Sequence, residues 1–448
     1  MPDAHNPAPA APPPNKRKYC DASILIFINF MYHCNFVFMG ATFKDLQKYF
    51  EINDEVRTLL RLAFVLPSMF SSPVFGYLTD RFSRKYLVAL GVGVWSFSNL
   101  CASFAPKLWL FLVMVALAAL GEACVNVVAP TLLSDLFVGD MRSRLLCVYY
   151  LTRPVSIGIK FLVRTLAPIL FSNWMWCLRL LVVVGVVNMV LALVMLHEPA
   201  RGELDGRQME VTMFDEDLKY LLRNRSYLIT TLALSAVRYC TGTLGLWFSP
   251  LLYKGLKIKY PDIEPHSVYS SNDLMFFLGG SLGLLVAYLI SRNVKETYPR
   301  GDPMICSMGV LAAMPFIFLA TELTYTDKYA TYGVLFLGFF FLSMIWAITT
   351  DICLGVVVPS RRGSAIGIML FATNALGHAW SSEITRLVAA GLTRYYDRKE
   401  KNPSNDVYAI QHAVLLTLLV AIVGGILYFV ASLFIADDLK KAKGDAAE

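Results

Sequence analysis

Residues 75–87, FGYLTDRFSRKYL, form a short charged segment between two apolar runs. Gly76 stands near its start, where the absence of a side chain would let two helices approach closely. Cations crowded between two hydrophobic runs are typical of a cytoplasmic loop of a membrane protein. The charged residues of the segment are Asp80, Arg81, Arg84 and Lys85. We therefore expect the chain to be arranged as membrane-crossing helices on either side of this loop.

The composition indicates the same class of protein. Of 448 residues, 56% are hydrophobic and only 16% are charged, which is far from an average soluble domain. Apolar runs of about 20 residues recur along the chain, and each is long enough to cross a hydrocarbon core of ~30 Å. The formal charge of +7 does not predict nucleic-acid binding, because the Lys and Arg residues lie in loops and not in one patch. The predicted fold is an all-α membrane protein with twelve transmembrane helices in two six-helix bundles.

A polar stretch divides the predicted spans into two sets of six. Within it, the apolar positions of residues 214–223 share one helical face, which predicts an amphipathic helix on the inner membrane surface. The expected spans lie near 22–43, 57–79, 86–105, 109–134, 144–171, 176–196, 226–253, 272–292, 303–322, 330–357, 362–391 and 407–436. The expected domains are a disordered cytoplasmic tail (1–21), an N-terminal bundle (22–196), a cytoplasmic linker (197–225), a C-terminal bundle (226–436) and a cytoplasmic tail (437–448). With both termini inside, the inner loops carry more Lys and Arg than the outer loops, as the positive-inside rule requires.

Several stretches carry a resemblance to known transporters. The pattern G-x-L-x-D-R-x-x-R-K of the opening segment resembles the loop after the second helix of major facilitator superfamily transporters, where the Asp and Arg lock one of two access states. The stretches GEACVNVVAPTLLSDLFVGDMRSR (121–144), TGTLGLWFSP (241–250) and WAITTDICLGVVVPSRR (346–362) are similar to the spinster family of lipid transporters within that superfamily. The resemblance implies movement of a lysophospholipid or a sphingolipid such as sphingosine-1-phosphate by rocker-switch alternating access, coupled to protons.

The chain departs from the spinster pattern at four places. Asn35-Phe36 stands where the family carries Asp-Arg, and Val115 stands where it carries an Arg before the fourth-helix Glu. Lys160 and Arg164 occupy glycine positions of the fifth helix, and Arg238 replaces a small residue of the seventh. This chain is therefore expected to be a divergent member of the family.

An ionisable side chain in the middle of a bilayer costs at least ~2.5–3.5 kcal/mol on insertion scales, so each one needs a reason. Glu122 lies deep in the fourth span, where it would carry a proton or contact a cationic head group; the alternative is a helix–helix hydrogen bond. Glu122 and Lys160 are equally far in sequence from Met141, at the centre of the fourth-to-fifth connection. Antiparallel helices would hold them at similar depth, so we predict that they pair.

Further cations within the spans are candidates for binding an anion. Lys160 and Arg164 share one face of the fifth helix with Arg153, either as a track for a phosphate head group or with the two arginines snorkelling toward opposite interfaces. Arg238 suits bidentate phosphate recognition; the alternative is an ion pair with Asp351 or Glu383. The candidate substrate and coupling residues are Glu122, Lys160, Arg164, Arg238, Asp351 and Glu383.

Two of these candidates have a second interpretation. Asp351 either lines the cavity or caps a helix end, and Glu383 and Arg386, three residues apart, either join the site or only satisfy each other. His378 is interpreted as a hydrogen-bonded core residue. The candidate residues of an inner gate are Gly76, Asp80, Arg81, Arg84, Asp135, Arg142 and Arg144.

The sequence holds no nucleophile elbow, zinc signature, phosphate-binding loop or nucleotide fingerprint, so we do not expect an enzyme. The nine cysteines are scattered and form no CxxC pair, which predicts neither a disulfide framework nor a metal site, and no cofactor is expected. Three functions remain open: a lysolipid transporter, a transporter of a smaller organic anion, and a non-transporting lipid sensor or scaffold. A lipid-facing opening between the fifth and eighth helices would favour the first. We expect a monomer in the lysosomal, late endosomal or plasma membrane.

Overall fold

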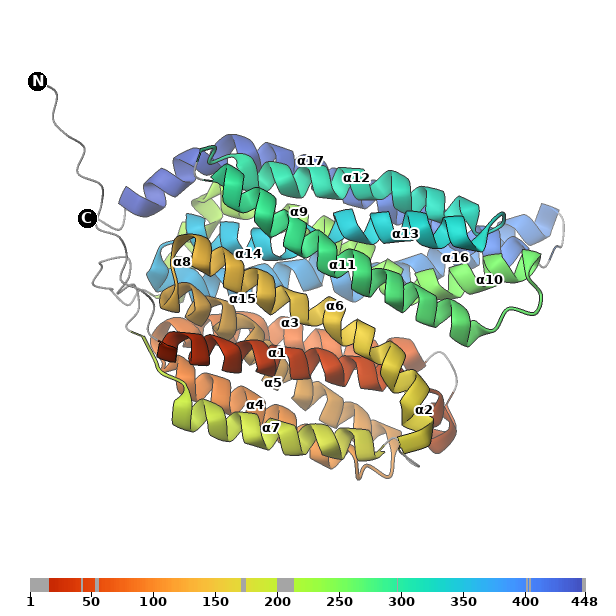
Figure 1. Cartoon of the computed structure of the whole chain (residues 1–448), viewed down its shortest axis with the longest axis horizontal. Helices are drawn as coiled ribbons and strands as arrows, with labels where there is room; N and C mark the ends of the chain where they lie inside the picture. Colours follow the sequence, from red (N-terminus) through yellow and green to blue (C-terminus); the bar gives the residue numbers. More distant parts are fainter. Residues whose placement is uncertain are drawn as a thin grey trace, which may run out of the picture.

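A computed structural model describes residues 16–41, 43–52, 56–170, 175–199, 213–295, 297–399, 402 and 404–444. These residues form helices joined by short connections, and none of them lies in a β-strand. The helices run roughly side by side in two groups (Figure 1). The first 15 residues of the predicted tail (1–21) and the linker segment 200–212 lie outside the described residues, whereas residues 16–21 are helical and not a disordered tail.

The first group contains six long helices and one short one. The short helix, α2 (Phe43–Phe50), follows α1 and is strongly amphipathic. The long helices are α1 (Lys16–Ala41), α3 (Val56–Arg81), α4 (Arg84–Ala102), α5 (Leu108–Leu136), α6 (Gly139–Leu170) and α7 (Met175–Met195). The connection between α3 and α4 is only two residues long, so the predicted charged loop is a tight turn between antiparallel helices.

The second group is connected to the first through α8 (Phe214–Arg223), whose first turn carries three acidic residues. Carboxylates at a helix start are stabilised by the unpaired backbone N–H groups there. The remaining elements are α9 (Arg225–Thr243), the π-turn η2 (Leu244–Phe248), α10 (Ser249–Lys259), α11 (Pro265–Lys295), α12 (Gly301–Leu323), α13 (Lys328–Ser343), α14 (Ile345–Val356), η3 (Pro359–Arg361), α15 (Arg362–Thr373), the π-turn η4 (Asn374–His378), α16 (Ala379–Lys399) and α17 (Asn405–Gly444).

The described helices form twelve long paths, because three pairs are nearly continuous: α9 with α10, α13 with α14, and α15 with α16. Eight of the paths are long and apolar enough to cross a membrane by length and composition. The other four are α4, α6, α9–α10 and α15–α16. α6 carries several cations, and the last two paths are interrupted by π-turns, which often occur at functional sites. The predicted fold class, two bundles of six transmembrane helices, is confirmed.

The helix ends differ from the predicted spans in a consistent way. The first helix begins at Lys16 and the last ends at Gly444, so both continue through basic segments that the apolar pattern excluded. Both ends lie beside α8, at one end of the molecule (Figure 1). We call this end, which also contains the α3–α4 turn and η3, the α8 end, and the opposite one the far end.

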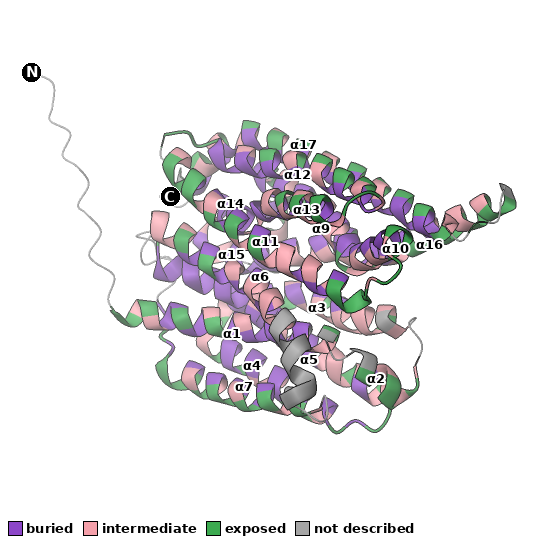
Figure 2. Ribbon diagram, turned by 45° about the vertical axis from the view of Figure 1, so that its right-hand side comes forward, coloured by how far each residue is buried: buried purple, intermediate pink, exposed green. Residues whose placement is uncertain are grey.

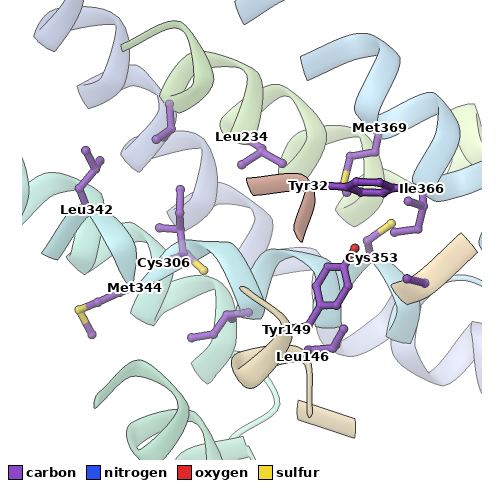
Figure 3. Packing of buried hydrophobic residues seen from close by; sticks show 14 of the residues in the cluster. Tyr32, Leu146, Tyr149, Leu234, Cys306, Leu342, Met344, Cys353, Ile366 and Met369 are labelled. Carbon is purple, nitrogen blue, oxygen red and sulfur yellow. The ribbon is translucent and has the colours of Figure 1, made fainter. Parts of the chain in front are cut away.

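The core is continuous between the two bundles. Buried residues concentrate where helices of the two groups meet, and exposed ones face outward (Figure 2). In one cluster, Tyr32 of α1 and Tyr149 of α6 lie beside Cys353 of α14 and Ile366 of α15 (Figure 3). The two bundles are therefore packed directly against each other on this side of the molecule.

Candidate functional site

Asp80, at the end of α3, caps a helix of the other bundle. Its two carboxylate oxygens accept hydrogen bonds from the backbone N–H groups of Gly363 (2.8 Å) and Ser364 (2.7 Å), in the first turn of α15. The first N–H groups of a helix have no partner within the helix, and the helix dipole favours an anion beside them. Asp80 therefore connects α3 to α15 at the α8 end.

Gly76 lies one turn before Asp80, where α3 and α15 cross. A Cβ atom at Gly76 would lie 2.7 Å from the carbonyl oxygen of Gly363 and 3.2 Å from the Cα atom of Gly367. Neither contact is with a flexible side chain, so any larger residue would push the two helices apart. The absence of a side chain at Gly76 thus permits the close approach that brings Asp80 to the start of α15.

Asp135, at the end of α5, is bound by two arginines. It forms ion pairs with Arg84, at the start of α4, and with Arg362 Nη1 (3.1 Å), at the start of α15. All three side chains are buried. One arginine belongs to the same bundle as Asp135 and the other belongs to the opposite bundle, so the cluster joins the two.

Asp351, in the middle of α14, repeats this arrangement in the second half. It is bound by Lys295, at the end of α11 in its own bundle, and by Arg142 Nε (2.7 Å), at the start of α6 in the other bundle. Ser143 Oγ adds a hydrogen bond of 2.7 Å. In both halves, an acid on the fourth helix binds one cation near the second-to-third connection and another at the start of the opposite fifth helix. The two clusters are related as the two halves of the chain are.

The linker helix α8 adds a third link between the bundles. Asp217 lies 3.1 Å from Arg81 Nη2 of α3 and 3.0 Å from Arg361 Nε of η3, and its side chain is buried between them. Arg81 also stacks on the ring of Tyr77 at 3.6 Å. At the α8 end, the two bundles are therefore joined by three acids, each bound by a cation from each bundle, together with the Asp80 cap; we call these links the ion-paired closure.

These contacts revise part of the sequence interpretation. Asp351, a candidate for the substrate region, is instead part of the ion-paired closure, because α14 carries it to the start of α6. Arg144 points outward and makes no hydrogen bond or ion pair with any side chain that the structure describes. The sequence interpretation did not assign four residues to this closure: Asp217, Lys295, Arg361 and Arg362. The repetition of Arg142-Ser143-Arg144 in Ser360-Arg361-Arg362 was the signal that could have found the last two.

A second group of cations lies deeper, between the bundles. The guanidinium carbons of Arg153 on α6 and Arg238 on α9 each lie 5.1 Å from the ring centre of Trp346 on α14. All three side chains are half-buried.

Arg61 on α3 extends this group toward the far end. Its Nη2 atom donates to the carbonyl oxygen of His378, in the π-turn η4, and lies 3.4 Å from Ser381 Oγ. His378 and His33 of α1 lie within electrostatic range of the arginines. His378 is thus bonded through its backbone, while its buried ring nitrogen Nδ1 has no hydrogen-bond partner within the described part of the chain.

Unlike the cations of the α8 end, three arginines in the middle of the molecule have no acid beside them among the residues whose side chains are described. None of Arg61, Arg153 and Arg238 forms an ion pair with a carboxylate among the residues whose side chains are described. The buried Nε atom of Arg238 also has no hydrogen-bond partner in these residues. The expected alternative for Arg238, an ion pair with Asp351 or Glu383, does not form. We call Arg61, Arg153 and Arg238 the central arginines.

The predicted Glu122–Lys160 pair does not form. Lys160 Nζ lies 3.1 Å from Asp273 Oδ1 of α11, whereas the Glu122 carboxyl group is hydrogen-bonded to Asn126, one turn further along α5. The two residues were expected to meet because their depths are similar. However, α6 packs against α1 and α11, while α5 packs against α3 and α4, so the helices separate after their connection. Equal depth did not produce contact.

The remaining candidates lie elsewhere. Glu383 accepts a hydrogen bond from Arg386 Nε (2.9 Å) on a partly exposed part of α16, as the second interpretation expected. The side chain of Arg164 is outside the described residues. The fifth and eighth helices, α6 and α11, are closely packed: a Cβ atom at Gly158 would lie 2.7 Å from the ring of Phe277. At this point of the described structure there is therefore no opening of the kind that would favour the lysolipid transporter.

Comparisons with known proteins agree with this geometry. Residues 25–382 match the Major Facilitator Superfamily, a class of membrane transporters whose two bundles this fold reproduces. A protein spinster homolog 1 from Bos taurus is 34% identical over 436 residues, covering 94% of this chain and 82% of the relative. A protein spinster homolog 3 from Danio rerio is 32% identical, with coverage of 96% and 87%. The chain belongs to the spinster family of the Major Facilitator Superfamily, and it is a transporter and not an enzyme.

A solved structure shows the same fold. The bacterial homolog of the human lysosomal transporter Spinster, in an inward-facing and unoccupied conformation, superposes with a TM-score of 0.64. The superposition covers 95% of this chain and 98% of that one at 14% identity. At this identity the likeness concerns the fold alone.

Proposed function

We propose that this transporter moves a lipid with a phosphate-bearing head group, of the lysophospholipid or sphingosine-1-phosphate type, by rocker-switch alternating access. The observation that carries the proposal is the set of central arginines without acids. Burying a charge without a partner is costly, and proteins normally pair it or neutralise it. A bound phosphate would supply the missing negative charge.

The residue type favours phosphate over other anions. A guanidinium group offers several N–H donors in a planar fork, and this fork matches the oxygens of phosphate or carboxylate in pairs. Two of the three arginines come from the first bundle and one from the second. A phosphate held by all three would connect the bundles at the middle of the protein, which is where an alternating-access carrier binds its substrate.

The closed α8 end represents one of the two access states in this proposal. We assign it to the cytoplasmic side, because the basic segments at the start of α1 and the end of α17 lie there and cations accumulate on that side of membranes. The inward-facing state would require the three acid–cation clusters to separate. A lysosomal, late endosomal or plasma membrane location and a monomeric state remain part of the proposal. The first is supported by the bacterial protein of the same fold, which is described as a homolog of a human lysosomal transporter.

Glu122 is the proposed proton carrier. Its carboxyl group lies on α5 beside the aromatic residues Tyr32 and Tyr149, with Asn126 as its hydrogen-bond partner. An adjacent cation would hold the carboxylate ionised and oppose protonation; the only cation predicted beside it, Lys160, is bound to Asp273 instead. Glu122 therefore retains the freedom to exchange a proton during the cycle.

Uptake into liposomes containing the purified protein tests the substrate. We expect uptake of labelled lysophosphatidic acid and little uptake of a monoacylglycerol with the same chain, which lacks the phosphate. Arg238→Gln should reduce uptake at least about tenfold, because a hydrogen bond to a charged group contributes about 1.5–3 kcal/mol. Arg394→Gln, a change of the same kind at an exposed position of α16, is the matched control. Equal uptake of the two lipids, or equal effects of the two variants, would contradict the proposal.

The proton hypothesis has a separate test in the same liposomes. A pH gradient should stimulate uptake by the wild type, and Glu122→Gln should remove the stimulation while leaving binding of the lipid intact. Stimulation that persists in Glu122→Gln would assign coupling to another group.

A second candidate, transport of a small organic anion, is favoured by the closed contact between α6 and α11. Such a substrate needs the central arginines but no entry path from the bilayer. Glycerol 3-phosphate distinguishes the two, because it carries the phosphate without the hydrocarbon chain. Competition by glycerol 3-phosphate at concentrations similar to those of lysophosphatidic acid would favour the small anion.

A further inference from the structure

Trp346 lies between the two bundles at a point where both contribute a cation. It is in the first turn of α14, directly after the break that separates α13 from α14 at Met344. Its ring faces Arg153 of the first bundle and Arg238 of the second, with both guanidinium carbons 5.1 Å from the ring centre. One aromatic side chain therefore contacts two cations that are not connected by any acid in the described part of the chain.

Two like charges held close together in the interior repel each other, since the low dielectric strengthens the interaction. Without a counter-ion, each arginine would be expected to turn away from the other. The face of an indole ring carries a negative partial charge and attracts cations more strongly than the ring of Tyr or Phe. Trp346 thus offers each guanidinium group a weak attraction without neutralising it, which leaves the full positive charge available to an anion.

We propose that Trp346 is a positioning residue for the anionic group of the substrate. Its indole ring holds Arg153 and Arg238 at one place before the substrate arrives, so that both can bind the same phosphate. The inference rests on the proposed function, because it assumes that the central arginines bind the substrate. It goes further by assigning to an uncharged residue the preorganisation of the site.

Neighbouring contacts explain how α14 keeps the ring in place. One turn beyond Trp346, Thr350 Oγ1 forms a 2.6 Å hydrogen bond with the hydroxyl group of Tyr150 on α6. Tyr150 is three residues before Arg153, so the bond fixes α6 and α14 together beside the arginine. Asp351, the next residue, is bound by Arg142 of α6. These contacts between α6 and α14 fix the position of the Trp346 ring relative to Arg153.

An ordinary packing role is the alternative, since Trp346 also packs against a small apolar cluster containing Cys147 and Leu284. Two variants separate the roles: Trp346→Phe keeps an aromatic face, whereas Trp346→Leu fills part of the same space without one. We expect the dissociation constant for lysophosphatidic acid, measured on the purified protein, to rise a few-fold in Trp346→Phe and at least about tenfold in Trp346→Leu, the scale of one cation–π contact in the interior. Packing alone predicts that each variant loses affinity in proportion to its loss of thermal stability, whether or not it keeps an aromatic ring.

A double-mutant cycle with Arg153→Gln tests whether the ring acts through the arginine. If it does, Trp346→Leu should weaken binding much less in the Arg153→Gln background than in the wild type, because coupled residues are not additive. Additive losses would overturn the inference. Wild-type protein that binds lysophosphatidic acid no better than the monoacylglycerol would refute the proposed function itself. Phosphate-dependent binding with equal affinity in the two Trp346 variants would overturn only the role of Trp346.

Discussion

The cations at the α8 end are paired with acids, whereas the arginines in the centre of the molecule are not paired with any described acid. At the α8 end, Asp135, Asp217 and Asp351 each bind one cation from each bundle. In the centre, Arg153 and Arg238 both lie over the ring of Trp346, and neither forms an ion pair with an acid in the described part of the chain. Both groups lie between the same two bundles, so the difference does not come from the fold but from where the acids are placed.

This difference separates two tasks of a carrier. Charges that are satisfied within the protein hold a closed end without any ligand, and they must be broken when the carrier changes state. Charges that lack a partner in the protein are satisfied only when an anion is bound. In the proposed mechanism, the first group determines the stability of one access state, and the second determines what is recognised. The following predictions test this separation, from the largest expected effect to the smallest.

The largest effect is expected from Asp351→Asn, which removes the acid that Arg142 binds, while Lys295 keeps its second ion pair, with Asp302 Oδ2 (3.3 Å). Removing one partner of a buried ion pair costs about 3–5 kcal/mol. We expect the closed α8 end to open, as measured by a longer distance between spin labels at the exposed positions Phe82 and Tyr298. An unchanged distance distribution would show that the ion pairs do not hold this end closed. Asp327→Asn, at the exposed start of α13, is a control with the same chemical change.

Gly76→Ala should have the next largest effect on the same distance. Its added methyl group would lie 2.7 Å from the carbonyl oxygen of Gly363, so α3 and α15 must move apart. Overpacking of this kind costs about 1–3 kcal/mol. Gly391→Ala on α16 is the matched control, because no described atom outside the adjoining backbone of its own helix lies within 4 Å of the added Cβ. If the two alanine variants give the same distance, the close helix crossing is not what supports the closed state.

Arginine variants from the two regions should change stability in opposite directions. Arg153→Gln removes a cation that has no acid, so the substrate-free protein should become slightly more stable, by about 1 kcal/mol or less. Arg142→Gln leaves Asp351 with one cation fewer and should lower the melting temperature instead. Melting curves of both proteins without lipid provide the measurement. A loss of stability in both variants would contradict the contrast between the regions.

Much of the fold was predictable because membrane-crossing helices leave a strong signal in the sequence. Length and apolar composition locate most of the spans, since the backbone must satisfy its hydrogen bonds within each helix. The two π-turns were not predictable, because they depend on packing between α9 and α16: Ser382 Oγ donates to the carbonyl oxygen of Gly242 and Trp247 donates to that of Ser382. The basic extensions of α1 and α17 were missed because the spans were located by their apolar residues, and these helical extensions are polar.

The candidate site was predicted less completely, for a geometric reason. Sequence separation along a hairpin gives depth but not direction, so it placed Glu122 and Lys160 together although α5 and α6 face different neighbours. Arg61 and His33 were not identified, because nothing in a single sequence shows that a residue near the start of α3 reaches the π-turn of α15–α16. Arg238 and the loop around Asp80 were identified because their charged residues stand among apolar residues, where a charge is costly and needs a structural or functional reason.

The smallest effect is expected from Arg144→Gln. This variant tests whether a single ion pair, and not the charge of the whole basic motif, matters at the α8 end. Arg142 and Arg144 are two residues apart in one basic motif, yet α6 turns Arg142 toward Asp351 and Arg144 toward solvent. An exposed side chain without a contact usually changes stability by no more than about 0.5 kcal/mol. We therefore expect the spin-label distance and the uptake of lysophosphatidic acid to be unchanged in Arg144→Gln. A distance shift as large as that expected for Asp351→Asn would mean that the charge of the motif, and not the ion pair of Arg142 with Asp351, holds the α8 end closed.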